Sequence, residues 1–268
     1  VASFGNYLLR KRRCGFHWVF IPLSLKSEQK GTCYVTGKRV YIKEFQVHNT
    51  PRKAGCRKSY RAAVSVYHPL CGRVYYWDTY FTNVGLLAMG NISQAKNNTD
   101  NIRFLINKYG YMPNGNRTFF LGATQPPFYF KMVEEIFEQT GDRIWLSESC
   151  AAIAKEYEYW QTHRSSPNGL NIYGNHAGYS SDVIERKYNY FKSRFKGYEA
   201  ESEEEKSLCA HTITALTESG WDCSSRFEIF GEFYNPIDLN SLLYGLEKTM
   251  EKFSVILGSG EADVWRKR

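Results

Sequence analysis

The clearest pattern of hydrophobic and polar positions lies near the C-terminal end, between residues 238 and 258. Apolar side chains recur there at steps of three and four: Leu239, Leu242, Leu243, Leu246, Met250, Phe253 and Leu257. This spacing places them on one face of a helix, with Asp238 as the expected capping residue and Gly258 at the end. The pattern predicts an amphipathic core helix.

Helical patterning dominates the whole chain from residue 91 onward. It predicts helices from Ser93, as a cap, to Gly110, and over 129–140, 145–163, 181–197 and 201–217, with a further helix starting after Ser259. Between the helices lie loops rich in polar and aromatic residues, at 71–81, 110–127, 164–180 and 218–236. Long loops in compact domains usually carry function, so a site is expected on them.

The first 70 residues differ from the rest in pattern and in charge. They show short β-type stretches at 32–36 and 39–45, and they hold 14 Lys and Arg against two acids, Glu28 and Glu44, a charge of +12. The remaining residues sum to −4, within a total of +8. Because no zinc-finger or RNP pattern accompanies this charge, a solvated basic arm is favoured over a nucleic-acid partner. Residues 1–70 are predicted to be peripheral to a helical domain at 71–268.

Composition and cysteine spacing narrow the class of protein. The 268 residues are 43% hydrophobic and 23% charged, and no apolar run approaches the roughly 18 residues of a membrane span. The seven cysteines, at 14, 33, 56, 71, 150, 209 and 223, form an odd set without a C-x-x-C pair, so neither a metal site nor a disulfide framework is expected. The basic cluster 10–13 precedes an apolar stretch, but Pro22 and the lack of a cleavage site argue against a signal peptide. These features favour a reduced, cytoplasmic setting without a membrane partner.

Two loops combine tryptophan and aspartate in a way that suits a sugar. The stretch 71–81 holds five aromatic residues together with Arg73 and Asp78, and 218–227 repeats the Trp-Asp pair behind Gly220. Aromatic faces stack on sugar rings, and charged groups hydrogen-bond to their hydroxyls.

These motifs resemble those of the trehalase family. Arg73 and the run Tyr76-Trp-Asp-Thr-Tyr-Phe81 are similar to the family signature Pro-Gly-Gly-Arg-Phe followed by Tyr-Trp-Asp-x-Tyr-Phe, and Ser219-Gly-Trp-Asp-Cys-Ser-Ser-Arg226 is similar to its Ser-Gly-Trp-Asp-x-Ser-Ser-Arg motif. Four shorter stretches follow the family order: Met112-Pro-Asn-Gly-Asn-Arg117, Gln125-Pro-Pro127, Gly169-Leu-Asn171 and Asp238-Leu-Asn240. The resemblance covers roughly residues 70–268.

The resemblance implies an all-α fold, part of an (α/α)6 toroid, and an inverting glycoside hydrolase acting on an α-glucosidic bond in trehalose or a related small sugar. It implies that Asp222 is the general acid. It assigns substrate binding to Arg73, Trp77, Asp78, Asn114, Gln125 and Gly220, and it implies no cofactor and no metal. A toroid gathers such loops at one end, so these side chains are expected to line one concave face.

Departures from the family pattern leave a second interpretation open. The arginine that precedes Ser-Gln-Pro-Pro in the family is Ala123 here, and 176–180 lacks the charged residues of the family's Arg-Pro-Glu-Ser-Tyr segment. No remaining acid, Glu218 included, stands in a motif for the catalytic base. The alternative is therefore a degenerate or truncated, non-catalytic carbohydrate-binding member, and the oligomeric state is left open.

Both ends of the chain look cut, because it opens on Val1 and closes inside the start of a helix. The chain is therefore expected to be an incomplete enzyme from a longer protein, whose base follows residue 268. It is also expected to be prone to aggregation, because Leu242, Leu246 and Phe253 would expose an apolar face that later helices cover.

Overall fold

A computed structural model describes residues 32–35, 38–41, 74–174, 178–222 and 224–268. By its internal contacts the chain divides into two units, Val1–His48 and Asn49–Arg268. The first unit contains strands β1 (Thr32–Val35) and β2 (Lys38–Tyr41), which pair antiparallel with Thr32 opposite Tyr41. β1 lies within the predicted stretch 32–36, and β2 overlaps the predicted stretch 39–45 but begins one residue earlier. The prediction that 1–70 is peripheral otherwise falls on residues outside those described.

The described part of the second unit is helical. Its α-helices are α1 (Tyr76–Ala88), α2 (Ile92–Tyr109), α3 (Tyr129–Thr140), α4 (Arg143–His163), α5 (Ser181–Arg194), α6 (Glu203–Ser219), α7 (Ile237–Leu257) and α8 (Ala262–Arg266). Short 3-10 turns occur at η1 (Thr118–Phe120) and η2 (Gly231–Phe233). The prediction of an all-α domain is confirmed, and α3 has the predicted bounds.

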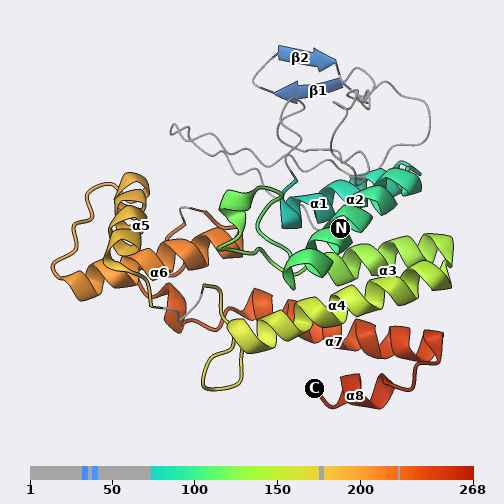
Figure 1. Cartoon of the computed structure of the whole chain (residues 1–268). Helices are drawn as coiled ribbons and strands as arrows, with labels where there is room; N and C mark the ends of the chain where they lie inside the picture. Colours follow the sequence, from blue (N-terminus) through green and yellow to red (C-terminus); the bar gives the residue numbers. More distant parts are fainter. Residues whose placement is uncertain (1–31, 36–37, 42–73, 175–177, 223) are drawn as a thin grey trace, which may run out of the picture. The chain divides into compact units, whose positions relative to one another are not determined.

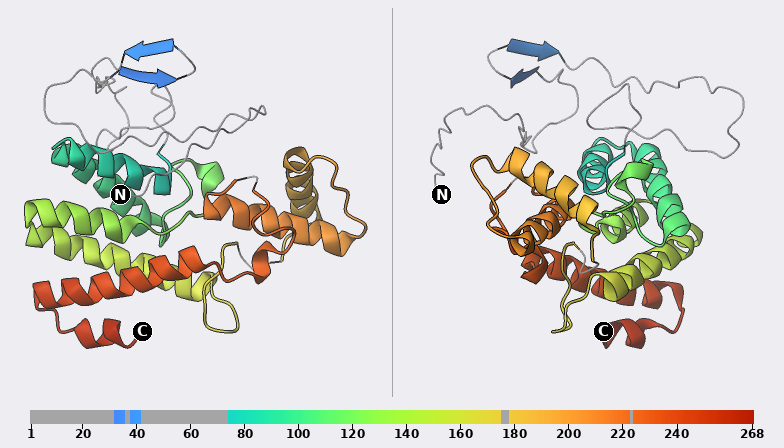
Figure 2. Two further views of the ribbon diagram at one scale, coloured as in Figure 1. Left: turned by 180° about the vertical axis from the view of Figure 1, so that it is seen from behind. Right: turned by 60° about the vertical axis from the view of Figure 1, so that its left-hand side comes forward.

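The helices pack in a way that brings several loop ends together (Figure 1). Helix α1 packs on α2 and α3, α2 on α3 and α4, and both α3 and α4 on α7, while α5 packs on α6 and α8 on α7. Figure 2 shows the pair α5–α6 to one side of the other helices. The first turns of α1, α3 and α7 and the last turns of α2, α4 and α6 face a common region, where the polar and aromatic loops run.

A buried polar chain ties three of these helices to one another. The Tyr76 hydroxyl of α1 donates to Glu156 Oε2 of α4 at 2.8 Å and accepts a bond from the Tyr129 backbone N–H of α3 at 2.9 Å. All three side chains are fully buried. Burial raises the pKa of Glu156 to about 8, so this carboxyl is largely protonated at neutral pH. The beginning of α1 is thereby anchored in the core.

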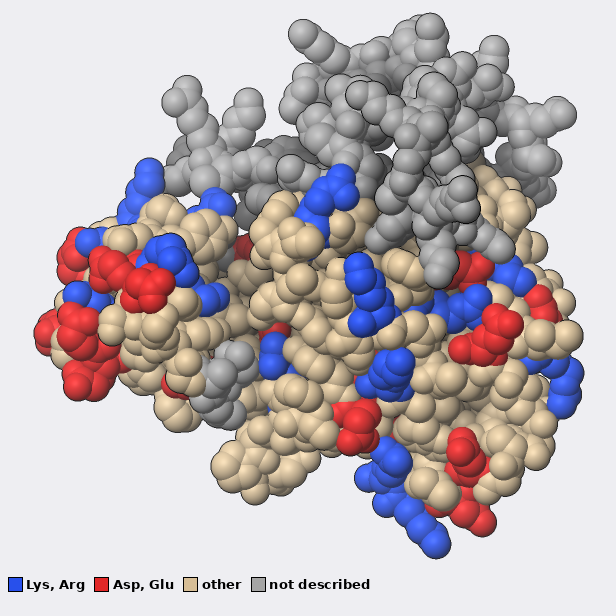
Figure 3. Space-filling view, viewed as in Figure 1, with Lys and Arg blue, Asp and Glu red and all other residues tan. Residues whose placement is uncertain are grey.

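The acidic run that begins near residue 201 forms the start of α6, as predicted. Its first turn carries Glu203, Glu204 and Glu205, and Ser202 caps it by accepting a bond from the Glu205 N–H at 3.2 Å. Negative charge is favourable at a helix N-terminus. Figure 3 shows acidic side chains gathered over the α5–α6 pair, with basic ones between them.

Three predictions about helix boundaries were wrong. Residues 76–81 are not a loop but the first turns of α1, whose buried face is Tyr76, Thr79, Asn83 and Leu87. Two of these four side chains are polar, which hid the helical period. Helix α2 is capped by Asn91 rather than Ser93, and Asp238 bonds to Arg226 instead of capping α7.

The prediction that the chain exposes the apolar face of α7 was also wrong. Leu246 and Phe253 are fully buried and Leu242 is partly buried, because α3 and α4 already cover this face. The exposed apolar residues of α7 are Ile237, Tyr244 and Val255.

Candidate active site

The first turn of α1 meets the loop that follows α6. Gly220 has a positive φ of 74°, and a Cβ at this position would lie 2.4 Å from Cζ2 of the Trp77 ring. Only glycine allows both this backbone conformation and this close approach. The two Trp-Asp segments, more than 140 positions apart in sequence, are therefore in direct contact.

The two carboxyl groups of these segments lie close enough to repel each other. Burial, together with a smaller effect of the charge of Asp222, raises the pKa of Asp78 to about 6. Burial also raises the pKa of Asp222, and the positive charge of Arg194 opposes this effect. The residue as a whole is nevertheless exposed to solvent. Both groups have an elevated pKa in one small region, which is typical of acid–base sites.

Asn114 and Gln125 reach the same region from the loop 110–127. Asn114 Nδ2 donates to the carbonyls of Thr124 and Thr217, each at 3.3 Å, and Gln125 Oε1 accepts from the Trp77 backbone N–H at 3.2 Å. Both amides are nearly buried. They hold the loop 110–127 against α1 and against the end of α6, and so fix the relative position of the predicted site residues.

The remaining motifs brace each other. Arg226 donates to both carboxylate oxygens of Asp238, with one of these bonds at 3.0 Å. Asn171 and Asn240 form a reciprocal pair, in which the Asn171 N–H donates to Asn240 Oδ1 at 2.9 Å and Asn240 Nδ2 donates to the Asn171 carbonyl at 3.0 Å. Three segments that are separate in sequence thus form one connected framework.

Glu218 is a feature of the site that its motif did not reveal. Its side chain is fully buried and forms an ion pair with Arg164, with Nη2 2.7 Å from Oε1. Sequence reasoning set it aside as an acid without a motif. A signal was present, because Glu218 lies on the buried side of a helix that ends three residues before Asp222, and a buried acid requires a partner.

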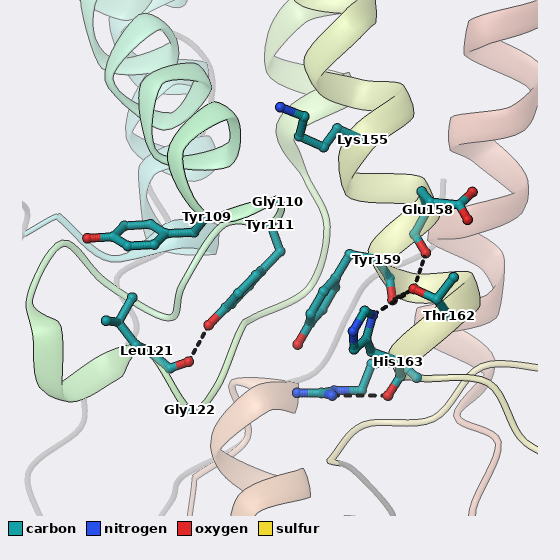
Figure 4. A pocket seen from close by; sticks show the side chains of 11 residues that line it. Tyr109, Gly110, Tyr111, Leu121, Gly122, Lys155, Glu158, Tyr159, Thr162 and His163 are labelled. Atoms are coloured by element: carbon teal, nitrogen blue, oxygen red, sulfur yellow. Dashed lines mark hydrogen bonds between the residues drawn. The ribbon is translucent and has the colours of Figure 1, made fainter.

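A separate hollow of about 670 Å³ opens beside the ends of α2 and α4 (Figure 4). Its walls include Tyr111, Tyr159 and His163, whose rings stack with centroids 4.3 and 5.0 Å apart, and Arg164. None of the described predicted site residues lines it. Arg164 is shared, since it borders the hollow and also binds Glu218.

Some sequence predictions fall outside the described residues, namely Arg73 and, in the segment 176–180, residues 176 and 177. Within the described ranges, His, Cys, Asp and Glu side chains form no group of three or more that could hold a metal ion. No helix in that part of the chain is long and apolar enough to cross a membrane.

Several known proteins are similar to this chain in sequence or in structure. The chain is 33% identical over 212 residues to a trehalase of Dictyostelium discoideum, and this match covers 71% of the chain and 35% of that protein. It is 32% identical over 200 residues to a periplasmic trehalase of Pseudomonas aeruginosa, a match that covers 67% of the chain and 36% of that protein. The structure of a neutral trehalase of Saccharomyces cerevisiae matches with a TM-score of 0.55 and 28% identity, over 69% of this chain and 38% of that one.

These relatives correct the predicted location. Several of them, from Pseudomonas, Xanthomonas and Salmonella species, are named periplasmic trehalases, so the prediction of a cytoplasmic protein was wrong. The prediction rested on unpaired cysteines. Cys150 and Cys209 are indeed free thiols, but a protein in an oxidising compartment need not contain a disulfide.

The fold and the family agree with the motifs. The helical part has the six-hairpin toroid type of fold seen in trehalases, in part, and the chain spans about a third of the length of its curated relatives. Residues 72–268 match the family described as trehalase. The chain therefore belongs to the trehalase family.

Proposed function

We propose that the protein containing this chain is a glycoside hydrolase that cleaves an α-glucosidic bond in trehalose or a related small sugar, with inversion at the anomeric carbon. The observation that supports this most directly is the pair Asp78 and Asp222. Two carboxyl groups with raised pKa meet beside the Trp77–Gly220 contact, at the junction of the family's sequence motifs. The names of the similar proteins point to the same reaction.

In the proposed mechanism Asp222 is the general acid. Its raised pKa favours the protonated form from which it donates to the departing glycosidic oxygen. An inverting enzyme also needs a carboxylate about 6.5–9.5 Å away that activates water on the opposite face of the sugar. We assign no residue of the chain to that second role.

The other predicted residues bind the substrate in this proposal. Asp78 accepts hydrogen bonds from sugar hydroxyls, the Trp77 ring covers an apolar sugar face, and Gly220 lets the backbone approach the ring. Asn114 and Gln125 keep a binding role through their amides while they brace the loop. Arg73 remains a proposed contact, and residues 71–268 form the proposed catalytic part. The proposed partner is a small sugar, and neither a nucleic acid nor a cofactor is invoked.

The experiment is hydrolysis of trehalose and other α-glucosides by the complete protein, followed by proton NMR of the first sugar released. For trehalose, the initial release of one α-glucose and one β-glucose shows inversion, whereas two α-glucoses would show retention. Asp222→Asn should lower kcat by at least about 10²-fold, the usual contribution of a general acid, with an unchanged circular dichroism spectrum. Binding of glucosides without turnover would refute the proposal and favour the non-catalytic carbohydrate-binding alternative.

A further inference from the structure

The carboxyl group of Glu218 is bound from three directions. Arg164 donates to it twice, from Nη2 to Oε1 at 2.7 Å and from Nε to Oε2 at 3.1 Å. The backbone N–H of Thr124 donates to Oε1 at 3.1 Å, and the backbone N–H of Gly174 donates to Oε2 at 2.6 Å. One side chain at the end of α6 thus holds the loop 110–127 and both ends of the segment 164–174.

Arg164 is itself fixed in place. Its side chain is 95% buried, its Nη1 donates to the His163 carbonyl at 3.0 Å, and its guanidinium lies 5.1 Å from the centroid of the Tyr159 ring. Burial lowers the pKa of Arg164, but the Glu218 carboxylate more than offsets this, so the guanidinium stays charged. The pair forms a rigid, desolvated connection with bidentate geometry.

The connection continues to the proposed general acid over four residues. After Glu218, the Ser219 hydroxyl accepts a bond from the Trp221 N–H at 3.2 Å, and Gly220 packs against Trp77. The turn therefore has little freedom, and a displacement of Glu218 would be passed on to Asp222. Asn114 adds a parallel restraint through its bond to the Thr217 carbonyl.

We infer that Glu218 and Arg164 are a positioning pair for the general acid, an inference that rests on the proposed function. Neither group is a catalytic residue, because Glu218 is fully buried and both its oxygens are already bound. The pair acts by fixing where the Asp222 carboxyl stands relative to the glycosidic oxygen. A misplacement of about 1 Å in a catalytic group can cost about 10²-fold in rate.

A comparison of leaving groups separates this role from a structural one. Departure of a sugar alkoxide from trehalose needs a proton from the general acid, whereas fluoride leaves α-glucosyl fluoride with much less help. In the complete protein, Glu218→Gln and Arg164→Lys should lower kcat for trehalose by about 10²-fold, with KM nearly unchanged. For the fluoride, kcat should fall less than about fivefold. Arg164→Lys provides the same test if Glu218→Gln does not fold.

Leu246→Ala serves as the matched control for lost stability. It removes buried side-chain volume from α7 without touching the loops, so any loss of folded protein affects both substrates to the same degree. Equal losses on trehalose and fluoride in the Glu218 and Arg164 variants would overturn the positioning role alone. A parent protein that hydrolyses neither substrate would refute the proposed function, and the inference with it.

Discussion

At the scale of single residues, the site is distinguished by a carboxyl group that the fold makes costly to ionise. Asp78 lies in the first turn of α1, where burial and the neighbouring Asp222 oppose its negative charge. An acid whose pKa is raised on folding binds more protons in the folded state than in the unfolded one. The free energy of unfolding must then fall as the pH rises through the interval between the two pKa values.

This argument predicts a pH-dependent effect of Asp78→Asn. The unfolded pKa is near 3.8 and the folded pKa about 6, so the parent loses stability between about pH 4 and 6 and the variant is spared that loss. The gain of the variant over the parent should increase by about 1–2 kcal/mol from pH 4 to pH 7, with solvent screening part of the full effect. Urea denaturation of the 268-residue chain at the two pH values measures it.

Asp182→Asn is the control for this prediction. Asp182 is exposed at the start of α5, and a bond from the Ser180 hydroxyl lowers its pKa. Its stabilising contribution is present above its unfolded pKa and lost as the pH falls, so its removal should give no gain at pH 7. A gain for Asp78→Asn that is equally large at pH 4 and pH 7 would contradict the assigned pKa.

A second residue-scale prediction concerns Gly220. An alanine Cβ there would overlap the Trp77 ring, so Gly220→Ala must displace Trp77 as well as strain the backbone. Gly110→Ala isolates the backbone cost, because Gly110 also has a positive φ but no atom lies within 4 Å of the added Cβ. We expect about 1–2 kcal/mol for Gly110→Ala and about 1–3 kcal/mol more for Gly220→Ala. Urea denaturation followed by tryptophan fluorescence compares them, and equal costs would argue against the close contact.

At the scale of elements, helix α7 has one face buried in the core and one face exposed to solvent. Leu246 is fully buried, whereas Tyr244, two positions earlier, is 63% exposed. Leu246→Ala should therefore cost about 2–5 kcal/mol in the free energy of unfolding, and Tyr244→Ala less than about 0.5 kcal/mol. Thermal or urea denaturation of the isolated chain tests this, and a large loss for Tyr244→Ala would mean that its face is covered in solution.

The same elements show what could be predicted from sequence and what could not. Helix α7 was recognisable because five of its seven buried residues are apolar, so the period of 3.6 is visible. In α1 the buried face includes Asn83, whose Nδ2 donates to Thr99 Oγ1 at 3.0 Å. The hydrogen-bond partner of this buried amide therefore comes from another helix, α2. A buried polar residue weakens the apolar period, and its partner is known only from the fold.

The residues of the candidate site also divide into those that the sequence predicted and those that it did not. The repeated Trp-Asp pair identified Trp77, Asp78 and Asp222 from the sequence, because tryptophan next to aspartate suits the binding of a sugar. The ion pair between Glu218 and Arg164 could not be predicted, because its members come from different helices and stand in no shared pattern. Nor could the bracing bonds of Asn114, which look in sequence like a turn or a sugar contact.

At the scale of the whole molecule, the described helical part of the chain is well braced around the candidate site. The loops at the ends of the helices are tied together by Glu218–Arg164, Asn171–Asn240 and Arg226–Asp238. These bonds lie within residues 74–268 and hold together the loops around Asp222. The proposed general acid and the proposed sugar contacts are thus expected to keep their arrangement in the isolated chain, whether or not it turns over a substrate.

This separation predicts different behaviour for binding and for catalysis. The chain spans about a third of the length of its relatives, and we assign it no catalytic base, a group worth about 10² to 10⁴-fold in rate. The isolated 268 residues should therefore hydrolyse trehalose at least about 10²-fold more slowly than the complete protein. They should nevertheless unfold cooperatively in urea, because the described helices share one buried hydrophobic cluster. Parallel assays of trehalose hydrolysis by the two proteins, with Asp222→Asn as the inactive reference, test this prediction. Turnover by the isolated chain at the rate of the complete protein would place both catalytic groups within these residues.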